Sequence, residues 1–444
     1  MSSSKRKRIW GWFFFDWASQ PFSTLVITFI FAPYIAELLQ DGPRAQAAWG
    51  FGIGAAGLVI ACLAPVLGAL ADTTGTRRTY IFVFSALYLL GSAGLWFAHP
   101  DSFNLLVILA LFAIGMIGLE FATIFTNAML PELGTKDEIG RISGNGWAFG
   151  YIGGLVALVI MLVFFAESPA TGKTFIGLAP AFGLDPDTRE GTRFVGPLTA
   201  IWFAVFVLPF FLWTTDTAPM KRSKHAVRDA LLGLVRTVRQ LPSTPSLFAY
   251  LTSSMFYRDG LNGFYAFGGI YAAGVLGWSV VDTGVFGIIA ILAGAIFAWL
   301  GGKAETQLGA KPVISVSILV LLAVAVAVVF ISRESVFGIS VDADSRLPDV
   351  VFYTFGALIG AAGGTLQASS RSMMVRQADP DRMTEGFGLY ALSGKATSFL
   401  APLLIGVTTA ATGSQQLGIA PLIGLFLFGL VLLFFVKPEG DTRT

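Results

Sequence analysis

The chain has 444 residues, of which 55% are hydrophobic and 13% are charged, and its formal net charge at pH 7 is +2. Soluble domains carry about 25% charged residues, so this composition excludes an ordinary soluble protein and predicts a membrane protein. The small net charge gives no indication of a nucleic-acid partner. The chain contains one cysteine, Cys62, which excludes an intrachain disulfide and a cysteine-based metal site. We expect neither a metal nor a cofactor.

Apolar stretches of the length that a bilayer core requires, about 20 residues, recur along the chain. The first follows a basic N-terminal segment and is too long to be the apolar core of a cleaved signal peptide. We predict an all-α membrane protein with twelve transmembrane helices in two pseudo-symmetric six-helix bundles, 1–215 and 246–444, joined by a polar linker, 216–245. The predicted spans are 10–39, 47–71, 79–98, 103–130, 145–166, 197–215, 246–274, 279–300, 312–333, 348–374, 387–412 and 417–436.

The distribution of lysine and arginine predicts the orientation, because cytoplasmic loops of membrane proteins carry an excess of both. With the N-terminus inside, and with Arg333 and Arg371 near span ends counted with the loops that they adjoin, 21 of the 29 basic residues lie in cytoplasmic segments, six lie in outer loops and two lie within spans. We therefore expect both termini to be cytoplasmic, in a bacterial inner membrane. In the linker, apolar and basic residues recur at helical spacing over 224–240, which predicts an amphipathic helix on the inner leaflet. A solvated connector helix is the alternative.

A tight charged turn follows the second predicted span and reads Gly-Ala-Leu-Ala-Asp-Thr-Thr-Gly-Thr-Arg-Arg. A glycine within it permits a positive φ, and its aspartate can pair with an arginine or a helix N-terminus. A charged inner loop is the plain interpretation, but the order of residues resembles the signature loop of the major facilitator superfamily. The resemblance implies a conformational latch between helix ends, formed by Gly68, Asp72, Gly75, Arg77 and Arg78. The corresponding segment of the second half, 301–311, retains this pattern only partly.

Four further motifs narrow the resemblance. They are Phe-Asp-Trp-Ala at 15–18, Asn-Ala-Met-Leu-Pro-Glu at 127–132, Gly-Gly-Thr-Leu-Gln-Ala-Ser-Ser-Arg-Ser at 363–372, and a glycine-rich segment at 385–395. In this order they resemble the vacuole effluxer-like branch of the superfamily, whose autophagy-related members export amino acids. The resemblance implies the major facilitator fold and amino-acid efflux. The chain departs from the branch at 19–21, Ser-Gln-Pro in place of Asn-Ser-Ala, and this puts the transported solute in question.

Polar side chains also lie inside the predicted spans. A charged group at membrane depth costs roughly 2.5–3.5 kcal/mol, so its retention indicates a function. Asp16 has a counterpart in Asp259, at a matching place in the second half, which indicates a path through the membrane. The resemblance implies that helices 1, 4, 7 and 10 line a central cavity. The predicted substrate-binding or translocation residues are Asp16, Gln20, Glu120, Asn127, Arg258, Asp259, Asn262, Gln367 and Lys395.

The charges in this set predict roles. Arg258 and Lys395 would hold a carboxylate, and Asp16 or Asp259 an ammonium group, so a zwitterion such as an amino acid fits. Glu120 has no adjacent basic residue, so we favour it as the acid that takes up a proton, with Asp16 second. Asp259 is next to Arg258, and we expect it to be structural or to orient the substrate. A static ion network is the alternative.

Together these features predict a secondary active transporter that moves a small polar solute out across the inner membrane by alternating access, coupled to protons. We expect a monomer in the lipid bilayer. The alternatives are an exporter of other small molecules or drugs, and a sensor that kept the fold without transport. An enzyme is not expected, because the two histidines are far apart in predicted loops and the sequence has no cysteine cluster. The sequence also has no nucleotide-binding loop of the Gly-x-x-x-x-Gly-Lys-Ser/Thr form, so we do not expect direct use of ATP.

The role predicted for Glu120 can be tested by the substitution Glu120→Gln. The amide keeps the size of the side chain and cannot titrate, so we expect a folded protein that retains counterflow and loses acid-stimulated transport. Uptake into proteoliposomes, with and without an imposed pH gradient, measures both properties. A normal pH dependence would place the proton on another acid.

Overall fold

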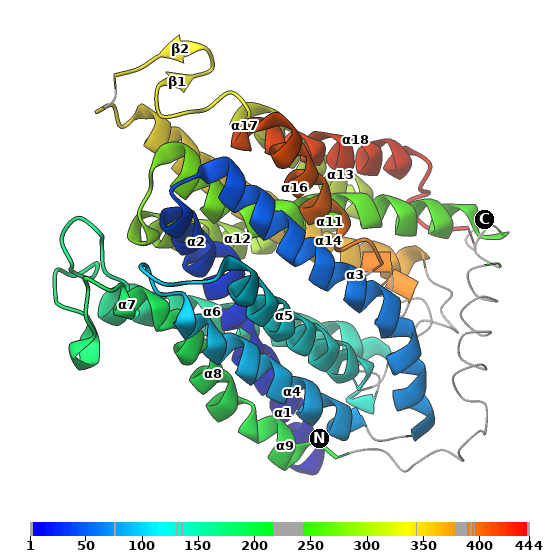
Figure 1. Ribbon diagram of the computed structural model, residues 1–444. Helices are drawn as coiled ribbons and strands as arrows, with labels where there is room; N and C mark the ends of the chain where they lie inside the picture. Colours follow the sequence, from blue (N-terminus) through cyan, green and yellow to red (C-terminus); the bar gives the residue numbers. More distant parts are fainter. Residues whose placement is uncertain are drawn as a thin grey trace. The chain divides into compact units, whose positions relative to one another are not determined.

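The computed structural model of the protein describes residues 3–74, 77–129, 132–134, 136–215, 239, 243–342, 344–377, 389–390, 393–394 and 396–441. These residues are almost entirely helical, with one two-stranded hairpin, β1 (Ser335–Val336) and β2 (Ile339–Ser340) (Figure 1). The predicted all-helical class is therefore confirmed.

The helices of the first half follow the predicted spans closely. Each of the first six spans overlaps one or more helices, and short 3₁₀ and π-helical turns extend several of them. The elements are α1 (Ser3–Pro21), η1 (Phe22–Phe29), α2 (Phe31–Leu39), α3 (Gly42–Thr74), α4 (Arg77–Gly94), η2 (Leu95–Phe97), α5 (Leu105–Ala128), α6 (Lys136–Ile160), η4 (Met161–Phe165), η5 (Ala181–Gly183), α7 (Glu190–Arg193), α8 (Val195–Phe206) and α9 (Leu208–Trp213).

The second half is equally helical. Its elements are α11 (Pro245–Leu276), α12 (Val280–Leu308), α13 (Ala310–Val328), α14 (Leu347–Gln377), α16 (Leu400–Thr412), α17 (Gln415–Ile419) and α18 (Pro421–Phe434). In the described part of the chain, eight helices are long and apolar enough to cross a membrane, and two shorter apolar helices lie at the fifth and eleventh predicted spans. The protein is thus an integral membrane protein, and the total of twelve spans stays a prediction.

The first span is not the single continuous helix that its apolar sequence predicts. Its middle turns are π-helical over η1, and the backbone then breaks at Ile30 before α2 begins. Pro21 ends α1, and a proline lacks the N–H group that would continue the α-helical hydrogen bonds. π-Helical turns within helices are often found at functional sites. The break divides the predicted span into α1, which carries Asp16, and α2, which packs against α11.

Contacts divide the chain into two compact units. Unit 1 comprises Met1–Val26, Ala55–Phe165 and Ala179–Leu241, and unit 2 comprises Ile27–Gly54, Ala166–Leu178 and Pro242–Thr444. Residues 27–54, which belong to the first two predicted spans, therefore pack with helices of the second half. The predicted bundles 1–215 and 246–444 stay a prediction.

Glycines bring helix backbones close together in both units. In unit 1 a Cβ atom added at Gly91 of α4 would lie 2.2 Å from the amide nitrogen of Gly115 of α5. In unit 2 a Cβ atom added at Gly360 of α14 would lie 2.0 Å from the carbonyl oxygen of Ala290 of α12. Small residues are the usual means of close packing between membrane helices, where lipid supplies no hydrophobic drive for association.

The contact between α12 and α14 predicts a large difference between two glycine substitutions. Gly360→Ala would force the two backbones apart, and overpacking of this kind destabilises by about 1–3 kcal/mol. Gly424→Ala in α18 is the matched control, because nothing lies within 4 Å of the added Cβ atom there. Thermal unfolding in detergent should show a lower Tm for Gly360→Ala and an unchanged Tm for Gly424→Ala. Equal Tm values would contradict this description of the contact.

Candidate functional site

Asp16 lies in unit 1 on α1, against a glycine face of α6. A Cβ atom added at Gly146 would lie 2.9 Å from Oδ2 of Asp16, and one added at Gly150 would lie 3.2 Å from its Cβ atom. One turn further on, a Cβ atom at Gly154 would lie 2.8 Å from Cγ of Gln20. Both polar side chains are half-buried. Glycines four residues apart on α6 therefore make the room that these two side chains occupy.

Two arginines of the predicted latch, Arg77 and Arg78, have partners in unit 1 that the sequence did not indicate. Nη1 of Arg77 lies 2.6 Å from Oε1 of Glu132, and Nη2 of Arg8 lies 3.5 Å from Oε2 of the same carboxylate. Arg78 donates a hydrogen bond to the carbonyl oxygen of Phe211 at the end of α9. Glu132 is the last residue of the motif at 127–132, and an acid directly after a predicted helix could have indicated a partner for these arginines. The signature loop is thus joined to α1, α9 and the residues after α5.

Several predicted residues cannot be placed in full. Gly75 and Lys395 lie outside the described residues. Asn127 is on α5, and Gly68 and Asp72 are on α3, but the description of these three stops at the backbone. Glu120 is described, as a half-buried residue in the middle of α5.

Asp259 is the most enclosed of the predicted acids. It lies on α11 in unit 2, and only 2% of its surface is exposed. Its Oδ2 accepts a hydrogen bond of 2.8 Å from the backbone N–H of Ala401, in the first turn of α16. Its Oδ1 has no hydrogen-bond partner among the described residues. The carboxylate thus satisfies one free N–H group of a helix N-terminus and leaves one oxygen unsatisfied in a buried position.

Arg258 does not neutralise Asp259, although the two are adjacent in sequence. Consecutive residues of a helix point in different directions. The guanidinium carbon of Arg258 lies 4.2 Å from the ring centroid of Tyr390, and Nη1 donates a hydrogen bond of 3.0 Å to the carbonyl oxygen of that tyrosine. A Cβ atom added at Gly394 would lie 2.5 Å from the guanidinium group, so the glycine lets the arginine take this position. Arg258 is therefore positioned by the short segment that precedes α16.

A cluster of tyrosines surrounds Tyr390, the ring that Arg258 contacts. The rings of Tyr250 and Tyr390 are stacked, with centroids 6.1 Å apart and planes 5° apart. The hydroxyl of Tyr257 lies 2.8 Å from Oγ of Ser370, and the hydroxyl of Tyr250 donates to the carbonyl oxygen of Ser370. The sequence reasoning missed these residues. The spacing of seven residues between Tyr250 and Tyr257 was the signal, because it places both on one face of α11.

The remaining polar residues of α11 and α14 have different surroundings. Asn262 is exposed, and Gln367 is half-buried with its Nε2 3.5 Å from the hydroxyl of Tyr265. In the part of the chain that the structure describes, no hydrogen bond joins either of them to Asp259 or Arg258. Of the predicted set, the described structure joins Asp259 to α16 and Arg258 to Tyr390, and it places Asp16 with Gln20.

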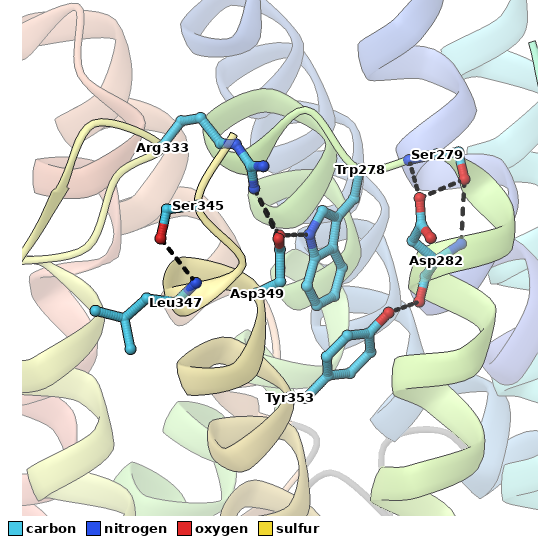
Figure 2. Close-up of polar contacts among 8 residues, drawn as sticks. All are labelled: Trp278, Ser279, Asp282, Arg333, Ser345, Leu347, Asp349 and Tyr353. Carbon is cyan, nitrogen blue, oxygen red and sulfur yellow. Dashed lines mark hydrogen bonds and ion pairs between the residues drawn. The ribbon is translucent and has the colours of Figure 1, made fainter. Parts of the chain in front are cut away.

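A second polar cluster joins the ends of α11, α13 and α14 in unit 2 (Figure 2). Nη1 of Arg333 lies 2.8 Å from Oδ1 of Asp349, which also accepts a 2.6 Å hydrogen bond from the indole of Trp278. The ring of Tyr353 stacks on Trp278 at 4.5 Å, and Asp282 forms a capping box with Ser279 at the start of α12. All of its charged groups are paired or cap a helix. The cluster therefore fixes helix ends.

A family model described as "Vacuole effluxer Atg22 like" matches residues 51–443, which is most of the chain. The chain belongs to this family. The resemblance predicted from the sequence motifs is thereby confirmed. One relative is an uncharacterized MFS-type transporter, YxiO, of Bacillus subtilis, which is 25% identical over 436 residues, 97% of this chain and 95% of the relative. The autophagy-related protein 22 of Cryptococcus neoformans is 25% identical over 306 residues, 67% of this chain and 49% of the fungal protein.

Solved transporter structures share the fold. A bacterial homolog of the human lysosomal transporter Spinster superposes with a TM-score of 0.66 and 13% identity, covering 100% of both chains. The xylose transporter XylE from E. coli superposes with a TM-score of 0.63 and 14% identity, covering 99% of this chain and 97% of XylE. The family member described here therefore has the major facilitator fold.

The hydrogen bond between Tyr257 and Ser370 predicts a non-additive pair of substitutions. Ser370→Ala leaves a buried tyrosine hydroxyl without this partner, which costs about 1–3 kcal/mol. Adding Tyr257→Phe removes the hydroxyl, so we expect the double variant to be no less stable than Ser370→Ala alone. Thermal unfolding of the two single variants and the double variant measures this cycle. Additive losses would show that the two hydroxyl groups do not interact.

Proposed function

We propose that the protein is a secondary active transporter that exports a small zwitterionic solute of the amino-acid class. Export would run across a bacterial inner membrane by alternating access coupled to protons, in a monomer with twelve spans and both termini cytoplasmic. The observation that carries the solute class is Arg258, a cation within a membrane-spanning helix. Among the described residues, no carboxylate lies within ion-pair distance of it.

The guanidinium group of Arg258 supports binding of a carboxylate. The ring of Tyr390 covers one face, and one hydrogen bond fixes Nη1, so the orientation of the planar group is set. None of its nitrogens is both buried and unpaired, so the remaining N–H groups reach accessible space. Two parallel N–H groups of a guanidinium match the two oxygens of a carboxylate. An unpaired cation at membrane depth is expensive, and an anionic substrate group would repay part of that expense.

The family and its named members support the direction and class of transport. The family is described as vacuole effluxer-like, and the Bacillus relative is named an MFS-type transporter. An exporter of other small solutes is the alternative, and ligand binding separates the two.

Ligand-induced stabilisation of the purified protein tests the proposal. A ligand that binds only the folded state stabilises it by about 2.7 kcal/mol at 100 times its Kd. We expect amino acids to raise the Tm of the wild type, and peptides without a free carboxylate and sugars to leave it unchanged. Arg258→Ala should abolish the rise in Tm.

Arg346→Ala is the matched control, because this arginine is exposed in the segment before α14. It should keep the response of the wild type to amino acids. Stabilisation by sugars alone, or an undiminished response in Arg258→Ala, would reject a carboxylate-bearing solute at this site.

A further inference from the structure

α16 is held at its first turn by Asp259. The bonded oxygen of this side chain caps the N–H group of Ala401, and its other oxygen is buried with no partner in the described structure. A negative charge at a helix N-terminus is favoured by the helix dipole, and the effect is largest within the first turn. The position of α16 therefore depends on whether Asp259 carries its charge.

Further along α16, a fully buried polar cluster holds the segment 27–54. Nε2 of Gln46 donates a 2.7 Å hydrogen bond to Oγ1 of Thr409 and a 3.1 Å hydrogen bond to the carbonyl oxygen of Gln415. Nε2 of Gln415 lies 3.4 Å from Oε1 of Gln46. The exposed fraction is 0% for Gln46 and Thr409 and 5% for Gln415. We call these three residues the amide cluster.

Backbone contacts lie beside the amide cluster. A Cβ atom added at Gly50 would lie 2.7 Å from the Cα atom of Gly406 on α16. A Cβ atom added at Gly269 of α11 would lie 2.0 Å from the carbonyl oxygen of Thr28. The segment 27–54 therefore contacts α11 and α16 through glycines, a few hydrogen bonds and the buried apolar side chains of α2.

The surroundings of Asp259 contain few charges. α16, α17 and α18 have no charged residue at all, and Arg258 is directed to Tyr390. Lys395, five residues before α16, lies outside the described residues. The charged residues on the other elements that pack against α11 are Glu37 on α2, Asp282, Lys303 and Glu305 on α12, and Asp349, Arg371 and Arg376 on α14. None of the seven forms an ion pair with Asp259 in the described structure.

We propose that Asp259, in place of Glu120, which the sequence alone favoured, binds the transported proton, and that this proton weakens the hold of α16 on the segment 27–54. The proton comes from a hydronium ion, whose O–H bond breaks as an O–H bond forms at Oδ1, and the proton later returns to water. The neutral carboxyl group loses its attraction to the N-terminus of α16. The new O–H group also has no described acceptor, so a shift of α16 becomes favourable. Thr409 of the amide cluster and Gly406 both lie on α16 and move with it, away from Gln46 and Gly50.

This inference names the proton site of the proposed transporter and so rests on proton coupling, but its test needs no solute. In a Cys62→Ser background, cysteines replace Phe51 and Val407, which are 43% and 48% exposed near the contact of Gly50 with Gly406. Nitroxide labels on the pair report their distance by electron spin resonance across a pH series. We expect a short distance at alkaline pH, and a fall of about fivefold or more in its population at acid pH.

Substitutions assign the response. Asp259→Asn keeps the shape of the side chain and cannot titrate, so it should show the acid distribution at every pH. Asp259→Glu keeps a carboxylate and should respond with a shifted midpoint. Gln46→Leu should lower the short population at every pH without moving the midpoint. Glu120→Gln should respond as the parent protein does.

The inference is overturned by any of three results. These are a distance that does not change with pH in the parent, a full response in Asp259→Asn, or loss of the response in Glu120→Gln. If Asp259→Asn does not fold, an unchanged midpoint in Asp259→Glu overturns it equally. A normal response in a protein that no amino acid stabilises would support the proton site and reject the proposed solute.

Discussion

Close approach of helix backbones is the constraint on which the rest of this structure depends. A polar side chain inside a membrane protein needs partners there, because lipid supplies none. Here the partners are mostly backbone groups and hydroxyls, and they come within reach only where glycine or alanine lets two helices touch. Asp16 fits against Gly146 and Gly150, and Asp259 reaches the N–H group of Ala401. The same residues that weaken a helix on its own, glycines above all, are thus what allows charged groups to be kept in the apolar core of each unit.

The two aspartates have different surroundings. Asp16 contacts α6, and Asp259 contacts α16. Gly146 and Gly150 lie in the interior of α6, where backbone N–H groups are already bonded within the helix. Ala401 lies in the first turn of α16, where the N–H group is free. Only the second acid therefore meets an unsatisfied helix terminus, and only there does a change of charge act directly on the position of a helix. The two aspartates therefore differ because α16 begins beside Asp259, whereas Asp16 lies beside the interior of α6.

Much of this could be predicted from the sequence, and the exceptions have physical causes. Hydropathy located the helices, because apolar length alone determines which segments can span a bilayer. The motifs identified the family, and the cost of a charge in lipid marked Asp16, Asp259 and Arg258. Hydropathy could not reveal the break at Ile30, since π-helical and α-helical turns have the same composition. Arg258 and Asp259 are adjacent in the sequence, but consecutive residues of a helix point in different directions, and the arginine instead lies on the ring of Tyr390. The partners Glu132 and Ser370 come from distant helices, and one sequence carries no record of such pairings.

The chemistry of the contact between α16 and the segment 27–54 suits a contact that must open and close. Interhelical hydrogen bonds in membrane proteins contribute on average only about 0.6 kcal/mol, because the separated groups find other partners. A buried ion pair would leave uncompensated charges on opening, at several kcal/mol. An interlocked apolar surface would lose its packing contacts all at once. The amide cluster and the paired glycines beside it contain neither an ion pair nor an interlocked apolar surface. They specify one register, because Gln46 can form hydrogen bonds with Thr409 and Gln415 together only there. These hydrogen bonds break at small cost. Under the proposed mechanism, the charge of the Asp259 carboxylate at the other end of α16 shifts this contact.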